Sequence, residues 1–119
     1  MPGTVVAEQR RILGQSNPAA TTSTALYTVP AGVQATVHAI IICNQAGSGG
    51  TFRVSLAIAG ATLATSQYLY FDTTIAANAT TIATFGDGVT LSQTDVIRVY
   101  ASSASQSFTA VGVERGGGL

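Results

Sequence analysis

Apolar and polar side chains alternate along most of this chain, and a period of two restricts it to β-structure. In residues 51–58 the even-numbered side chains are large and apolar, and the odd-numbered ones are polar or small. This alternation predicts a strand with one buried face. Residues 33–44 also alternate: the odd-numbered side chains form one face, and the even-numbered ones are polar up to His38 but apolar at Ile40 and Ile42. The end of this strand is therefore expected to be covered on both sides. Further strands are expected over residues 24–29, 66–72, 80–85, 96–101 and 107–114.

Short turn sequences separate these strands. Val29-Pro30-Ala31-Gly32 has proline and glycine where a type I turn prefers them, and so predicts a hairpin between residues 24–29 and 33–44. The glycine-rich residues 45–50 predict a second hairpin to residues 51–58, and Gly86-Asp87-Gly88 predicts another reversal. Seven to eight strands at this spacing predict an all-β protein with a single antiparallel β-sandwich or jelly roll.

The length of 119 residues supports one domain with a single core. We assign the β-sandwich to residues 14–115. Residues 1–13 are expected to form an N-terminal arm or an edge strand, and residues 116–119 a flexible glycine-rich tail. Removal of residues 2–13 is expected to leave the fold intact.

Charge is scarce in this chain. Asp, Glu, Lys and Arg make up 8% of the residues, against about 25% in ordinary soluble domains, and every basic residue is an arginine. A net charge of zero disfavours a nucleic-acid partner, because no basic stripe is available to neutralise a phosphate backbone. A surface covered mostly by Ala, Thr, Ser and Gly suits a subunit that packs among other subunits.

Residues able to carry catalysis or to hold a metal are few. His38 is the only histidine and has no carboxylate near it in sequence, so a surface or interface position is expected and a general base is not. Asp72, Asp87 and Asp95 each stand where a strand is expected to meet a turn, a place where short carboxylates cap backbone N–H groups. We therefore expect no enzyme, no cofactor, no metal and no small-molecule substrate.

The single cysteine, Cys43, lies in an apolar run and is expected to be a small buried side chain. One cysteine cannot form an internal disulfide, which is typical of a protein made in a reducing compartment. The first residues lack the basic and apolar regions of a signal peptide, and no apolar run reaches the ~18 residues of a membrane span. We therefore expect synthesis in the cytoplasm and no membrane partner.

Residues 68–71 put large side chains on both faces of one expected strand. Tyr68 and Tyr70 share one face, and Leu69 and Phe71 share the other. In a domain of two sheets one set fills the core, and the other set must be shielded or form a contact surface, because aromatic residues are enriched in the cores of interfaces. Core and interface positions are equally open for Tyr68 and Tyr70.

Several segments together resemble small virion proteins of tailed bacteriophages. They are LYTVPAG at residues 26–32, AIIICN at 39–44, TFRV at 51–54, QYL at 67–69 and DVIRVY at 95–100, and the likeness covers most of residues 12–114. The chain is most similar to capsid decoration (cement) proteins, which implies a non-enzymatic β-sandwich on the capsid surface of a virion. The resemblance also implies two partners, the major capsid protein and further copies of the chain in a homotrimer, and it carries over no catalytic residue.

Six residues are the candidates for contacts with neighbours: Arg10, Arg11, Ile40, Ile42, Tyr68 and Tyr70. The two arginines would reach a neighbour's carboxylates, which a guanidinium can bind through two parallel hydrogen bonds. Two other functions stay open. One is a tail, neck or fibre-associated virion subunit, which the same sandwich could serve. The other is a carbohydrate-binding sandwich that uses Tyr68, Tyr70, Asp72 and Tyr100.

Overall fold

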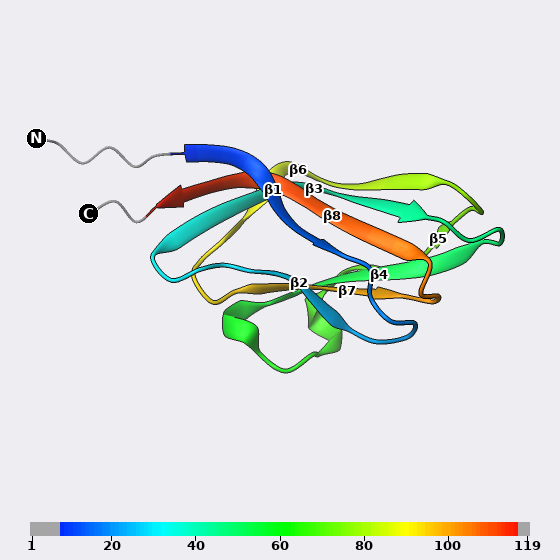
Figure 1. Cartoon of the computed structure of the whole chain (residues 1–119). Helices are drawn as coiled ribbons and strands as arrows, with labels where there is room; N and C mark the ends of the chain where they lie inside the picture. Colours follow the sequence, from blue (N-terminus) through cyan, green and yellow to red (C-terminus); the bar gives the residue numbers. More distant parts are fainter. Residues whose placement is uncertain (1–7, 117–119) are drawn as a thin grey trace, which may run out of the picture.

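The computed structural model describes residues 8–116, which form two four-stranded antiparallel sheets packed face to face (Figure 1). The strands are β1 (Glu8–Ser16), β2 (Thr24–Thr28), β3 (Val33–Asn44), β4 (Gly50–Ala57), β5 (Tyr68–Ile75), β6 (Thr80–Leu91), β7 (Val96–Ala101) and β8 (Gln106–Gly116). Sheet I has the order β1-β8-β3-β6, and sheet II has the order β2-β7-β4-β5. This is the arrangement of a jelly roll, and it confirms the predicted all-β sandwich.

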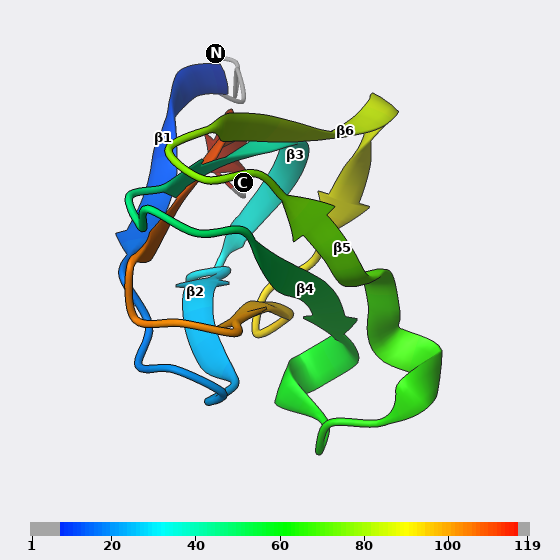
Figure 2. The ribbon, with the colours of Figure 1, turned by 90° about the vertical axis from the view of Figure 1, so that its right-hand side faces the viewer.

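Between β4 and β5 the chain forms two short 3₁₀-helices, η1 (Ile58–Gly60) and η2 (Thr65–Gln67). They lie beyond the end of β4, at one end of sheet II (Figure 2). No helix within residues 8–116 is long and apolar enough to cross a membrane.

The predicted hairpins are wrong. β3 lies in sheet I, whereas β2 and β4 lie in sheet II, so the turns before and after β3 both pass from one sheet to the other. Within residues 8–116, β4 and β5 are the only strands consecutive in the chain that are hydrogen-bonded to each other. Turn residues determine where the chain reverses, but the partner of each strand is set by the burial of both apolar faces in one core.

β6 also departs from the prediction, because Gly86-Asp87-Gly88 does not end it. The register with β3 moves from Val89 directly to Thr84, so the intervening residues bulge out of the pairing and the strand continues to Leu91. Gly86 and Gly88 have φ angles of 61° and 106°, which glycine adopts readily.

A bulge in β3 decides which side chains fill the core. The register of β3 with both neighbours passes from Val37 to Ala39 and leaves His38 without a partner. After that extra residue the inward face changes from odd-numbered to even-numbered residues. Ile40 and Ile42 are therefore 0% exposed and point between the sheets, and their predicted place on an interface is wrong.

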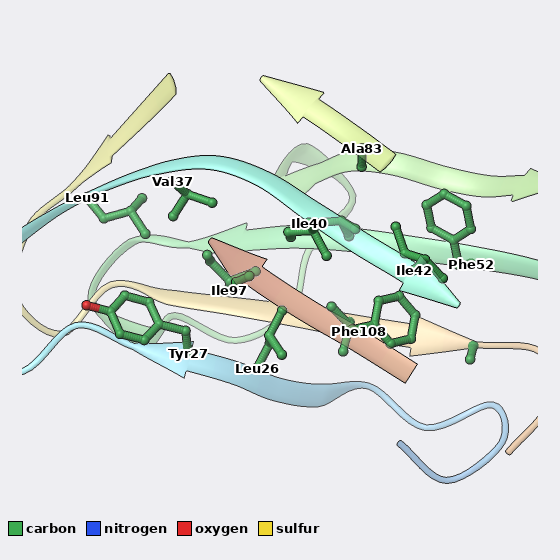
Figure 3. Close-up of a cluster of buried hydrophobic side chains, with 14 of the residues drawn as sticks. Leu26, Tyr27, Val37, Ile40, Ile42, Phe52, Ala83, Leu91, Ile97 and Phe108 are labelled. Carbon is green, nitrogen blue, oxygen red and sulfur yellow. The ribbon is translucent and has the colours of Figure 1, made fainter. Parts of the chain in front are cut away.

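The core is built around two phenylalanines from opposite sheets. Phe52 of β4 and Phe108 of β8 meet edge to face, with ring centroids 6.4 Å apart, beside Ile40 and Ile42 (Figure 3). Full burial of a side chain of this size contributes about 2 kcal/mol relative to leaving it exposed. The apolar faces of both sheets are thus used in one core.

Residues 8–16 form an edge strand, β1. β1 pairs with β8 from Glu8 to Ser16, and Leu13 packs against the core. β1 crosses the predicted domain boundary after residue 13, so removal of residues 2–13 would delete most of an edge strand. Residues 1–7 and 117–119, which include parts of the predicted arm and tail, lie outside the described residues, and Gly116 is the last residue of β8.

Candidate interaction surfaces

The outer face of sheet I is uncharged across three neighbouring rows of residues. The register aligns Ile12, Val111, Ala39 and Thr84 in one row, Gln15, Thr109, Ile41 and Ile82 in the next, and Ser107, Cys43 and Thr80 in the third. We call these residues the neutral face. Ile12 and Ile82 are 56% and 57% exposed, although isoleucine is among the residues most often buried. A partner can bind here without desolvating a charge.

Among residues 8–116, all the charged residues of sheet I except Asp87 gather at the start of β1, beside the neutral face. Arg115 Nε binds Glu8 at 2.8 Å, and Arg11 Nη1 binds Glu114 at 3.1 Å. The hydrogen bond and the positive charge of Arg115 lower the pKa of Glu8. Arg10 is exposed and makes no side-chain hydrogen bond or ion pair with any other described residue. Of the two arginines predicted for an interface, Arg11 is engaged within the chain and Arg10 is available.

Glu114 also joins sheet I to sheet II. Tyr27 of β2 is 7% exposed and donates its hydroxyl proton to Glu114 Oε2 at 2.5 Å. Burial, and then the hydrogen bond to Glu114 and its negative charge, raise the pKa of Tyr27 well above the ordinary value for a phenol. The phenol stays a neutral donor, and Arg11, Glu114 and Tyr27 form a continuous polar chain across this end of the sandwich.

β5 separates the two tyrosines that were predicted to share a face. Its register with β4 pairs Tyr70 with Val54 and Tyr68 with the next residue, Ser55, so Leu69 has no partner. This extra residue turns Tyr68 and Tyr70 to opposite sides of sheet II. Figure 2 shows β5 beside β4 at the edge of that sheet, where an irregular strand disturbs hydrogen bonds on one side alone.

Tyr70 is partly buried and faces the core. Its ring lies 6.1 Å from that of Phe52 and 6.0 Å from that of Phe85, centroid to centroid. Its hydroxyl group donates to the backbone oxygen of Thr84 at 2.8 Å and thereby links β5 to β6 across the edge of the sandwich. Tyr70 therefore packs against the core as a partly buried side chain with a satisfied hydroxyl group, and its predicted interface role is not supported by this position.

The outer face of sheet II carries an arginine surrounded by aromatic rings. Arg53 Cζ lies 4.2 Å from the ring centroids of both Phe71 and Tyr100, and 5.9 Å from that of Tyr68. Arg53 Nε and Nη2 donate to the two carboxylate oxygens of Asp72 at 2.6 and 3.3 Å. The hydrogen bond to Asp72 raises the pKa of Arg53, which remains a cation. We call these five residues the arginine cluster.

The three aspartates have different environments. Asp95 has the predicted capping role: its two carboxylate oxygens accept the backbone N–H groups of Ala59 and Ser92, each at 2.9 Å. Asp72 instead lies inside β5 and pairs with a side chain, and Asp87 lies in the bulge of β6. The capping prediction is therefore right for Asp95 alone. It is wrong for Asp72 and Asp87 because β5 and β6 extend beyond the residues where the sequence pattern predicted their ends.

His38 and Cys43 lie at different places along β3. His38 is exposed at the β3 bulge, and Cys43 is half-buried on the neutral face, so the expected burial of the thiol in the core is wrong. Among residues 8–116, no three His, Cys, Asp or Glu side chains come together in a way that could hold a metal ion.

Sequence reasoning missed Arg53 and Phe71. Phe71 was placed on the face opposite Tyr68, whereas their rings meet edge to face at 4.9 Å. The sequence did contain one signal for Arg53: it is the only charged residue of its strand and lies on the polar face. A charge between two buried neighbours, Phe52 and Val54, needs partners on the outer face, and aromatic rings and a carboxylate provide them.

No protein-family model and no curated protein sequence matches this chain. Its fold is similar to that of a protein from Bacillus endospore appendages, which form a novel family of disulfide-linked pili, with a TM-score of 0.55 and 12% identity over 97% of this chain and 90% of that one. It is also similar to a chain of infectious bursal disease virus, Gx strain, with a TM-score of 0.52 and 10% identity over 93% of this chain and 31% of that one. At these identities the likeness is one of fold.

Proposed function

We propose that the protein is a non-enzymatic virion subunit, a decoration (cement) protein that stabilises the head of a tailed bacteriophage by bridging subunits of the major capsid protein. The observation that carries this proposal is the neutral face, an uncharged surface with two exposed isoleucines on a jelly roll. Contacts made there favour the closed shell, because opening the shell must also separate them. Likeness in fold to a pilus protein and to a virus protein supports a role as a subunit of an assembly.

Two kinds of contact are assigned to different parts of sheet I. The neutral face packs on the shell and excludes water, while Arg10, at the charged end of edge strand β1, donates to a carboxylate of a neighbouring subunit. Assembly as a homotrimer is proposed from the sequence resemblance alone. A mass three times that of the 12.0 kDa chain, measured by light scattering after size exclusion, supports the trimer, and the mass of a monomer contradicts it.

Cryo-electron microscopy of the parent particle tests the proposal directly, because it locates the chain and counts its copies. Density on the outer shell at three-fold or quasi-three-fold positions supports a cement protein. Density confined to the tail, neck or fibres transfers the same fold to the alternative virion role. Absence from the particle contradicts both.

Matched isoleucine variants test whether the neutral face makes the contact. Ile82→Asp and Ile12→Asp each place a charge on this face and are expected to weaken binding to particles that lack the protein by more than about tenfold, because an unpaired carboxylate would be desolvated. Ile58→Asp is the control, since Ile58 is 74% exposed on η1, away from the neutral face. Equal binding of the Ile82→Asp and Ile58→Asp variants contradicts the assignment. Circular dichroism of each variant is the control for correct folding.

A further inference from the structure

The aromatic side chains that do not serve the core all lie in one place. The chain has four tyrosines and four phenylalanines. Those that pack in the core or against it are Tyr27, Phe52, Tyr70, Phe85 and Phe108. The others, Tyr68, Phe71 and Tyr100, all lie within 6 Å of the Arg53 guanidinium, measured from Cζ to the ring centroids. Separate exposed aromatic residues would be unremarkable, but their concentration around one cation needs a reason.

The backbone of β5 is distorted in a way that assembles this cluster. Opposite Arg53, the register moves from Phe52–Thr73 to Val54–Tyr70, so Phe71 and Asp72 together face a single residue of β4. Asp72 has a φ of 49°, in the left-handed region that a non-glycine residue seldom occupies. Bulges are frequent beside binding sites, where they redirect side chains.

Part of the arginine cluster remains open to solvent and to further hydrogen bonds. Phe71 is 55% exposed, and the side chain of Asp72 is 44% exposed. Each carboxylate oxygen of Asp72 receives one hydrogen bond from Arg53, although a carboxylate can accept about four. Nη1 of Arg53 donates to no acceptor within residues 8–116. The ion pair thus fixes both groups and leaves acceptors and a donor free beside an exposed ring.

The combination suits one class of ligand. A sugar ring presents a face of C–H groups, which can pack on the face of an aromatic ring, and pairs of hydroxyl groups, which a carboxylate and a guanidinium can bind together. A polyanion is disfavoured, because the Arg53 charge is neutralised by Asp72 and the net charge of the chain is zero. We propose that the arginine cluster is a carbohydrate-binding site, with Phe71 as the stacking platform and Asp72 and Arg53 as the hydroxyl-binding pair.

This site is separate from the proposed assembly surface. It lies on the outer face of sheet II, whereas the neutral face is the outer face of sheet I, on the opposite side of the sandwich. A subunit seated through its neutral face would still present the arginine cluster to solvent. The inference goes beyond the proposed function and is tested on the isolated protein, so either can fail without the other.

The test uses saturation-transfer NMR, which measures saturation passed from the protein to the protons of a bound sugar. Glucose, galactose, mannose and N-acetylglucosamine are each added alone at millimolar concentration. We expect transfer to the ring C–H protons of at least one sugar, and about tenfold weaker binding of that sugar by Phe71→Ala, because the stacking surface is lost. Asp72→Asn keeps a side chain that tolerates the left-handed backbone, and is also expected to weaken binding. Ile82→Ala, on the neutral face, should bind as the unaltered protein does.

A second measurement needs no variant. Backbone amide shifts of the unaltered protein, followed as the sugar is added, should change in β4, β5 and β7 around the arginine cluster and not in β1 or β6. Absence of transfer from all four sugars, or binding that Phe71→Ala leaves unchanged, would overturn the proposal. Loss of particle binding in Phe71→Ala together with absence of sugar binding would also overturn it, and would assign the cluster to a protein contact.

Discussion

The two outer faces of this sandwich obey the same alternation in sequence but differ in almost every physical property. On the neutral face β3, β6 and β8 pair without interruption, only β1 has an irregularity, next to Ile12, and the side chains are mostly aliphatic or hydroxyl-bearing and carry no charge. The arginine cluster includes an irregular edge strand and combines an ion pair with three aromatic rings. A surface of repeated short side chains suits extended packing, whereas a rigid group of unlike side chains suits recognition of a particular ligand. The difference shows that alternation determines which face of a sheet is outside. The residue types on that face, and the bulges in its strands, determine what the face can bind.

The β3 bulge sets which side chains of this strand face the core, and a further one-residue change of phase after it should have the largest effect. Insertion of one alanine between Ala39 and Ile40 would turn Ile41 and Cys43 inward and Ile40 and Ile42 outward, a larger change than a single point substitution makes. We expect a loss of more than about 4 kcal/mol in the free energy of unfolding, or no cooperative transition at all, in urea followed by circular dichroism. Stability within about 1 kcal/mol of the unaltered protein would mean that the bulge does not set the two faces.

Two isoleucines on opposite faces of sheet I test the difference between the core and the neutral face. Ile42→Ala empties a fully buried site and should lower the free energy of unfolding by about 2–5 kcal/mol. Ile82→Ala, at a side chain that is 57% exposed, should change it by less than about 0.5 kcal/mol. Urea denaturation of both variants measures the contrast, and similar losses in the two variants would contradict the assignment of faces.

The polar chain of Arg11, Glu114 and Tyr27 closes the charged end of the sandwich, beyond the neutral face. Tyr27→Phe should lower the free energy of unfolding by about 1.5 kcal/mol near neutral pH, because a hydrogen bond to a charged group is lost. The raised pKa of Tyr27 makes this contribution complete below the unfolded-state pKa of about 10, and it is lost as the pH rises above that value through the folded-state pKa.

Denaturation of the Tyr27→Phe variant and of the unaltered protein across this alkaline range is the measurement. The stability difference between them should narrow as the pH rises. A difference that stays constant above pH ~10 would show that the phenol is not held neutral by Glu114.

On the opposite face, Arg53 holds the irregular strand β5 in place. Arg53→Ala removes the contacts with Phe71 and Tyr100 and the ion pair with Asp72, and should lower the thermal midpoint by a few degrees. Arg10→Ala is the matched control, because Arg10 is exposed and unpaired among residues 8–116. Scanning calorimetry compares the two variants, and equal midpoints would show that the arginine cluster does not stabilise the sheet.

The smallest effect is expected at the Glu8–Arg115 pair, which is open to solvent. The pKa of Glu8 is lowered, so its contribution is present above the unfolded-state pKa of about 4.3 and is lost as the pH falls through the lower folded-state pKa. Glu8→Gln should reduce the thermal midpoint by about one degree near neutral pH and leave it unchanged in strong acid. A larger loss of thermal midpoint in acid than at neutral pH would contradict a lowered pKa of Glu8.

The sequence predicted the strands and the sandwich because side-chain period and turn residues are local properties. It could not reveal the β3 bulge, since Ile40-Ile41-Ile42-Cys43 is apolar on both faces and hides the change of phase at His38. Strand partners were missed because pairing in the jelly roll joins distant segments. The arginine cluster was found in part, through Tyr68, Asp72 and Tyr100, but Phe71 reaches it through the β5 bulge, which no turn residue announces.

The pairing of β1 with β8 determines when the fold can be completed. Glu8 pairs with Arg115, so the first described strand finds its partner at the other end of the described chain. On a ribosome that adds roughly 5–20 residues per second, β1 must wait several seconds before β8 emerges. An unpaired apolar strand would invite wrong partners during that delay, whereas Glu8, Arg10 and Arg11 place charges on this edge. These three charges thus disfavour wrong pairing of β1, the strand that waits longest for its partner.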